Sequence, residues 1–109
     1  MPDHMSVLLK RYREAVVQIL GERFSRMILF GSYARGDFKK ESDMDIMILV
    51  DVGPEEISSY ADKVYDVTYD FEMQYGMEIN PSLQSTRTYE QWRKVYPFFI
   101  NIEKDGVLV

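Results

Sequence analysis

Cysteine is absent from this 109-residue sequence, and histidine occurs only once. The lack of cysteine excludes a disulfide framework, a thiolate zinc site and a cysteine nucleophile. Carboxylates are therefore the only plentiful metal ligands in the chain. A chain without disulfides is typical of the cytoplasm, which is the compartment that we expect.

Long apolar runs and an excess of positive charge are also lacking. No stretch approaches the roughly 20 apolar residues that span a bilayer, and residues 1–4 lack the charged and apolar regions of a signal peptide. The chain has 13 Lys and Arg against 18 Asp and Glu, which gives a net charge of -5. We therefore expect that it binds neither nucleic acid nor membranes.

The rest of the composition is that of an ordinary globular protein, with 46% hydrophobic and 28% charged residues. The length predicts a single domain over residues 1–109. In chain order, the apolar spacing and the Gly and Pro positions predict a helix (6–20), a strand (27–30), a central strand (46–50), a long helix (57–75), an edge or bulged strand containing Pro81 (77–83) and a short helix with a Thr88–Gln91 capping box. The fold class that follows is α+β, a small α/β layer of helices packed on a short mixed sheet.

The segment 31–50, GSYARGDFKKESDMDIMILV, holds the most informative polar residues. Gly31 and Ser32 follow a predicted strand, and a helix that starts near Tyr33 would direct free backbone amides outward as an anion site. The Ser32 hydroxyl and the Arg35 guanidinium would add donors suited to a triphosphate. The alternative is a tight turn in which the serine only caps the backbone.

Asp43 and Asp45 stand at the entrance of the predicted central strand. Residues two apart on a strand project from one face, so both carboxylates can converge on one cation. Oxygen ligands favour Mg²⁺ or Mn²⁺, and such an ion would offset the repulsion between the two charges. The alternative is a solvated strand start where Asp43 caps a local turn.

The combination of Gly-Ser, ten further residues and Asp-x-Asp opening an apolar strand resembles the signature of the nucleotidyltransferase superfamily related to DNA polymerase β. The chain is similar to its minimal bacterial branch, and the resemblance extends to Ala34-Arg35-Gly36, the long helix and the segment 101–107. The resemblance implies a polymerase β-like fold. It also implies a third carboxylate on a neighbouring strand, for which Glu78 is the matching residue. The alternative for Glu78 is an exposed edge-strand glutamate, and Asp70 and Glu72 are weaker rivals.

The activity implied by this resemblance is the Mg²⁺-dependent transfer of a nucleoside monophosphate to a hydroxyl group, with AMP from ATP as the expected case and pyrophosphate as the leaving group. Asp43, Asp45 and Glu78 would then hold two metal ions, and Gly31, Ser32 and Arg35 would bind the nucleotide. Small members of this branch resemble antitoxins paired with a helical ribonuclease toxin of the HEPN type, whose tyrosine they adenylylate. The alternatives are a non-catalytic module that neutralises a partner by contact and a small-molecule nucleotidyltransferase. The oligomeric state stays open.

Aromatic residues are numerous near the C-terminal end of the sequence. The residues Tyr89, Trp92, Tyr96, Phe98 and Phe99 are too clustered for one small core to bury all of them. Some of them are therefore interpreted as a partner surface. Lys39 and Lys40 are interpreted as solvated loop residues.

Overall fold

The computed structural model describes residues 3–39 and 41–109, so Lys40 lies outside the described residues. The helices are α1 (Asp3–Leu20), α2 (Ser32–Arg35), α3 (Ile57–Tyr75), α4 (Thr86–Trp92) and α5 (Pro97–Asp105), with short 3-10 turns η1 (Gly21–Arg23) and η2 (Pro54–Glu56). The strands are β1 (Phe24–Phe30), β2 (Met44–Val50), β3 (Ile79–Ser85) and β4 (Val107–Leu108).

The four strands form one mixed sheet in the order β3-β2-β1-β4. Strand β1 is antiparallel to β2 and to β4, whereas β2 and β3 are parallel. The prediction that residues 46–50 form a central strand is confirmed, as is the edge position of the strand that contains Pro81. Proline has no amide hydrogen to donate, and an edge strand tolerates this loss.

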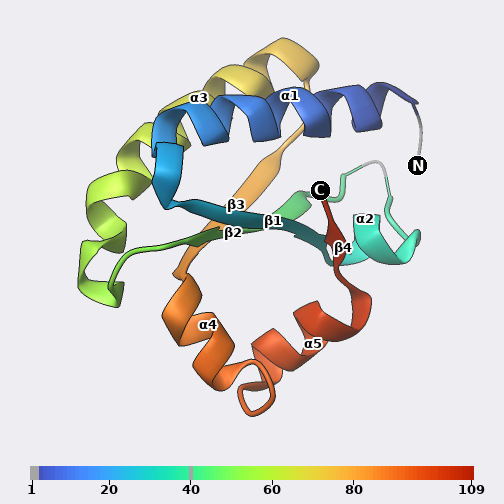
Figure 1. Cartoon of the computed structure of the whole chain (residues 1–109). Coiled ribbons are helices and arrows are strands. Elements are labelled where there is room, and N and C mark those ends of the chain that lie inside the picture. The colour runs from blue at the N-terminus through green and yellow to red at the C-terminus, as the bar shows by residue number, and fades with distance from the viewer. Residues whose placement is uncertain (1–2, 40) are drawn as a thin grey trace.

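Helices cover both faces of the sheet (Figure 1). Helices α1 and α3 lie on one face and α4 and α5 on the other, so the protein has three layers. The side chains of β2 alternate accordingly: Ile46 and Ile48 belong to the core under α1 and α3, whereas Met47 and Leu49 belong to a second, smaller core against α4 and α5. A strand apolar on both faces is thus explained by a helical layer on each side.

The long helix α3 matches its prediction at both ends. Pro54 opens the 3-10 turn before it, and Gly76 ends it in the left-handed conformation with φ 62°. Its inward side chain Thr68 is buried and donates a hydrogen bond to the carbonyl oxygen of Val64 at 2.7 Å. The hydroxyl of Tyr12 in α1 lies 2.7 Å from the same Thr68 oxygen. Because Thr68 already donates its proton, Tyr12 must be the donor of this buried link between the two helices.

The C-terminal part departs from the sequence-based expectation in three ways. The predicted capping box at Thr88 is wrong, because the N-cap of α4 is Ser85, three residues earlier. Residues 97–105 form a second short helix, opened by Pro97 at its first turn. Residues 107–108 pair with β1 as a fourth strand. A two-residue strand carries no period, so the sequence pattern could not indicate it.

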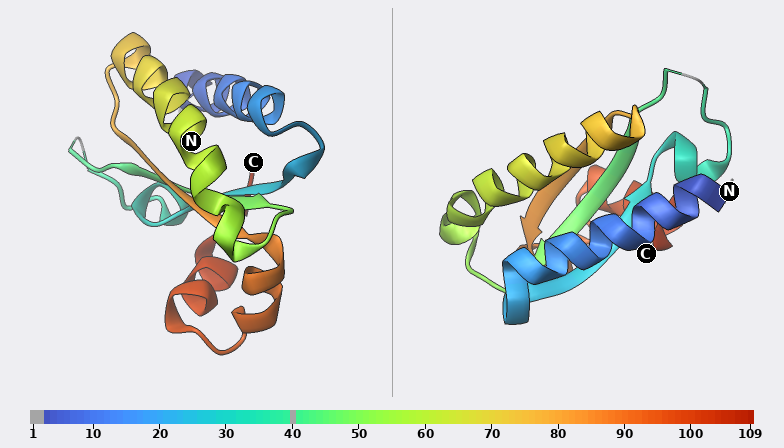
Figure 2. Two further views of the ribbon diagram at one scale, coloured as in Figure 1. Left: turned by 90° about the vertical axis from the view of Figure 1, so that its left-hand side faces the viewer. Right: turned by 90° about the horizontal axis from the view of Figure 1, so that it is seen from above.

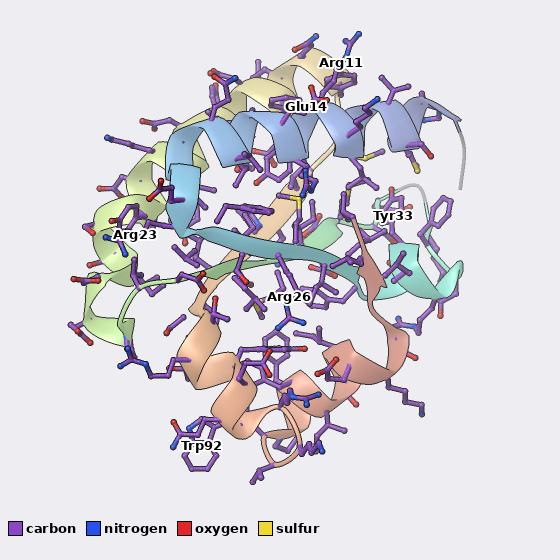
Figure 3. All side chains as sticks on the ribbon, viewed as in Figure 1. Arg11, Glu14, Arg23, Arg26, Tyr33 and Trp92 are labelled. Carbon is purple, nitrogen blue, oxygen red and sulfur yellow. The ribbon has the colours of Figure 1, made fainter. Side chains whose placement is uncertain are left out.

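The clustered aromatic residues of this layer divide into two groups. Tyr89 and Phe99 are buried in the second core, whereas Trp92, Tyr96 and Phe98 are each at least 40% exposed. Trp92 points away from the sheet at the far end of α4 (Figure 3). Arg26 of β1 forms an ion pair with Glu90 and joins this layer to the sheet. Within the described part of the chain, no helix combines the length and apolar character needed to cross a bilayer.

Candidate active site

The Gly-Ser turn connects β1 to the short helix α2. Gly31 has φ 76° and ψ -154°, a conformation that only glycine adopts readily, and it is the N-cap of α2. A Cβ atom at Gly31 would overlap the Asp45 carboxylate. The absence of a side chain therefore permits both the turn and the close approach of Asp45 to the backbone. The predicted short helix near Tyr33 is confirmed.

Helix α2 is a single turn whose first amides have no partner inside the helix. Its bonds run from the Arg35 amide to the Gly31 carbonyl oxygen at 3.1 Å and from the Gly36 amide to the Ser32 carbonyl oxygen at 2.9 Å. Tyr33 is buried and stacks on Phe38 with a ring separation of 4.4 Å, which anchors the following loop. The Arg35 guanidinium is half exposed and lies 3.3 Å from the Asp37 carboxylate.

Asp45 is the second residue of β2 and pairs with Phe30 of β1 on one side and with Asn80 of β3 on the other. The Asn80 side-chain amide donates a hydrogen bond to the Asp45 carboxylate at 3.1 Å. Sequence reasoning missed Asn80. No distinctive spacing indicates it, because Glu78, two residues earlier, lies before β3 begins.

Asp43 and Glu78 lie side by side just before their strands begin. The Met44 amide donates to the Glu78 carbonyl oxygen at 3.0 Å, which aligns the two segments. A hydrogen bond with Asp43 and the charge of that carboxylate raise the pKa of Glu78 above its usual range. The expectation that Glu78 lies within a strand is corrected, because β3 begins one residue later, at Ile79.

The rival carboxylates have other positions. The Glu72 carboxylate accepts a hydrogen bond from the Ile79 amide at 2.9 Å and so fixes the start of β3 against the end of α3. Asp70 is exposed on α3. The charge of Glu72 contributes to the raised pKa of Glu78, but less than Asp43 does.

Carboxylates are suitable ligands for a hard cation. However, the described residues contain no cluster of three His, Asp or Glu side chains positioned to bind one metal ion. Asp43 lies close enough to Glu78 to raise the pKa of that carboxyl, and a divalent cation between the two carboxylates would relieve their repulsion. Asp45 lies two residues farther along on the same face, with one oxygen held by Asn80. All of these ligands are oxygen atoms, which fits Mg²⁺ or Mn²⁺.

A pocket of about 240 Å³ lies at Glu78, whereas Asp43, Asp45 and the predicted nucleotide-binding residues Gly31, Ser32 and Arg35 do not line it. It is lined by Tyr33, Glu41, Ser42, Gly76, Met77 and Glu78. Enclosed small-molecule sites begin at roughly 300 Å³. A nucleoside triphosphate would therefore extend beyond this pocket onto the open surface.

Residues 9–105 match the family model described as "Nucleotidyltransferase domain". Two proteins of Methanocaldococcus jannaschii named "Putative protein adenylyltransferase" are similar in sequence. One is 33% identical over 99 residues, which cover 90% of each chain. The other is 35% identical over 74 residues, which cover 68% of this chain and 73% of the relative.

Solved structures of low sequence identity have the same fold. A nucleotidyltransferase from Sulfolobus solfataricus superposes with a TM-score of 0.59 at 18% identity, over 96% of this chain and 78% of its own. A structure described as a "putative minimal nucleotidyltransferase" superposes with a TM-score of 0.54 at 20% identity, over 93% of this chain and 92% of its own. A toxin–antitoxin structure with AMP-PNP superposes with a TM-score of 0.52 at 13% identity, over 91% of this chain and 70% of its own. The polymerase β-like fold predicted from the sequence is confirmed, and the chain belongs to the nucleotidyltransferase domain family of enzymes.

Proposed function

We propose that this protein transfers AMP from ATP to a hydroxyl group of a partner protein, in a reaction that requires Mg²⁺ or Mn²⁺. The hydroxyl oxygen, on losing its proton, bonds to the α-phosphorus, and the bond between the α and β phosphates breaks to release pyrophosphate. The observation that carries the proposal is the position of the Asp45 carboxylate beside Gly31, where a Cβ atom would overlap it. Asp45 of β2 thus lies next to the turn that opens α2, whose first amides have no partner inside that helix. Groups for phosphate and groups for a divalent cation thus share one surface.

The residues of the chain have separable tasks in this reaction. The amides after Gly31 and the Ser32 hydroxyl bind the β and γ phosphates. Asp43 and Asp45 hold the metal ion of the triphosphate, and Asn80 keeps the Asp45 carboxylate oriented. Glu78, together with Asp45, holds the second ion next to the acceptor hydroxyl. When bound, the two ions stabilise the attacking and leaving oxygens and lower the pKa of that hydroxyl.

The acceptor in this proposal is a tyrosine hydroxyl of a HEPN-type toxin, and its modification silences the toxin. The names of the two relatives, "Putative protein adenylyltransferase", support a protein as the acceptor. The toxin–antitoxin with a similar fold supports a toxin as that protein.

A mass measurement tests the proposal. The protein is incubated with ATP, Mg²⁺ and a purified HEPN-type protein from the same organism. We expect an added AMP on the partner, located on a tyrosine by peptide fragmentation, and no addition when EDTA replaces Mg²⁺. An unmodified partner that still binds tightly would contradict transfer.

A contact-only antitoxin is the second candidate. It is favoured by the finding that, within residues 3–39 and 41–109, no three acidic side chains already converge on one point. Under this alternative the partner is silenced without ATP. Measuring toxin ribonuclease activity with and without ATP separates the two candidates.

A further inference from the structure

The outward face of α3 carries large side chains that no other part of the described chain covers. Tyr65, Tyr69 and Met73 recur every four residues and are 49%, 61% and 68% exposed. The opposite side of the helix packs against α1 and β3, with Val64 and Thr68 buried. Figure 2 shows α3 on the outside of its layer, with no further element over it. We refer to this exposed side of the helix as the α3 outer face, which consists of Tyr65, Tyr69, Met73, Asp62, Asp66 and Asp70.

Three aspartates share this face. Asp62, Asp66 and Asp70 also recur every four residues and are exposed, so they alternate with the aromatic side chains along the helix. None of the three forms an ion pair with any residue that the structure describes. Like charges at this spacing destabilise a helix by a few tenths of a kcal/mol per pair. The free protein therefore gains no stability from them.

The charge of the whole protein is concentrated here. The segment 54–75 contains six Asp and Glu and one Lys, a net charge of -5, which equals the net charge of the whole chain. The remaining residues contain 12 acidic and 12 basic side chains and are neutral in sum. The acidic composition is thus a local property of one helix and the turn before it.

We propose that the α3 outer face is the docking surface for the partner protein, through a partner surface that carries Arg or Lys side chains among apolar ones. Aspartates pair with such cations, and Tyr rings bind them by cation–π contact while covering their alkyl stems. Phosphate-rich nucleic acid and anionic lipid would be repelled. A second copy of this chain, docked by the same face, would place aspartates against aspartates.

The position of this face suits the proposed function, on which the inference rests. Met73 lies one helical turn before Gly76, and Gly76, Met77 and Glu78 line the pocket at the carboxylates. A protein seated along α3 thus reaches the edge of that pocket with its own surface. Docking there would present an acceptor hydroxyl to the nucleotide.

The test measures binding of a purified HEPN-type protein from the same organism by calorimetry. Asp62→Asn/Asp66→Asn/Asp70→Asn is expected to weaken binding at least tenfold and to reduce its dependence on salt. Tyr65→Ser/Tyr69→Ser is expected to weaken it by a similar factor. The matched control Glu22→Gln/Asp51→Asn/Asp105→Asn removes the same charge elsewhere and should change the affinity less than twofold. Because the aspartates repel one another, the first variant should melt no earlier than the wild type.

The outcomes separate docking from catalysis. Equal binding by the wild type and the triple Asn variant overturns the docking surface, even where AMP is transferred. Tight binding that needs α3 but gives no AMP addition overturns the proposed function and retains the docking surface. Binding of single-stranded RNA or anionic vesicles through α3 would overturn the proposal, because the occupant would then not be a protein. Self-association of the wild type that is lost in the triple Asn variant would also overturn it, because the occupant would then be a second copy of this chain.

Discussion

Asn80 holds Asp45 by a hydrogen bond of 3.1 Å from its side-chain amide to the carboxylate, across the parallel pair β2–β3. This bond gives the central carboxylate of the site one fixed oxygen and leaves the other against Gly31. The orientation of Asp45 thus depends on three strands. In the proposed reaction Asn80 would therefore position Asp45.

Replacing Asn80 tests this positioning role. Asn80→Ala should lower the rate of AMP transfer about five- to tenfold, because one hydrogen bond to a carboxylate contributes about 1 to 1.5 kcal/mol. The side chain is exposed, so the melting temperature should hardly change. Asn80→Ser, which keeps a short donor, should recover part of the rate. An unchanged rate for Asn80→Ala, measured by radiolabel transfer, would show that Asp45 needs no such support.

Alanine substitutions at Gly31 and Gly36 separate the effect of the close approach of Asp45 from the effect of backbone strain alone. Gly31 and Gly36 both have positive φ, but a Cβ meets Asp45 only at Gly31 and meets nothing within 4 Å at Gly36. Gly36→Ala should cost about 1 to 2 kcal/mol of unfolding free energy from strain. Gly31→Ala should cost more and should also abolish transfer. Urea unfolding and activity assays measure both, and equal losses at the two positions would contradict the role of the Gly31–Asp45 contact.

How much could be predicted from sequence depended on the length of each pattern. The helices over 6–20 and 57–75 have several turns of apolar spacing, and the structure has them as α1 and α3. The strand at 46–50 was predictable because it is apolar on both faces. The last helix and the two-residue β4 were not, because short apolar runs fit several structures.

The sequence was sufficient to select some residues of the candidate site but not others. Asp43, Asp45 and Glu78 were selected from spacing and from the resemblance to a family, and the structure brings Glu78 against Asp43. Asn80 was missed because an asparagine after an apolar residue has no distinctive spacing. Its role depends on the parallel register of β2 and β3, which only the folded chain defines.

Metal-dependent nucleotide binding should require both aspartates of the strand entrance. Asp43→Asn/Asp45→Asn should remove the Mg²⁺-dependent part of ATP affinity, because the ion of the triphosphate loses both proposed ligands. Calorimetric titration of ATP with and without Mg²⁺ measures this part directly. Asp37→Asn serves as a control, since it removes an exposed charge of the same loop. Unchanged Mg²⁺-dependent affinity in the double variant would exclude this metal site.

Stability at alkaline pH should depend on Tyr12. Burial raises the pKa of Tyr12 to about 12, from 10.0. The folded state therefore holds this proton more tightly than the unfolded state, so the stabilisation is complete below pH 10 and is lost as pH rises to about 12. A shift of this size corresponds to about 3 kcal/mol. Urea unfolding measured between pH 10 and pH 12 should show a smaller fall in unfolding free energy for Tyr12→Phe than for the wild type. An equal fall in the two proteins would assign the effect to other tyrosines.

The rate of AMP transfer by Glu78→Gln tests the central claim most directly. The side chain touches Asp43 and lines the pocket, and glutamine preserves its size. Glu41→Gln, in the same pocket, is the matched control. With ATP, Mg²⁺ and the partner protein, we predict at least a hundredfold loss of rate for Glu78→Gln, about 2.7 kcal/mol in the barrier, with ATP affinity nearly unchanged. Transfer at the wild-type rate by Glu78→Gln would contradict the proposed catalytic role of this carboxylate.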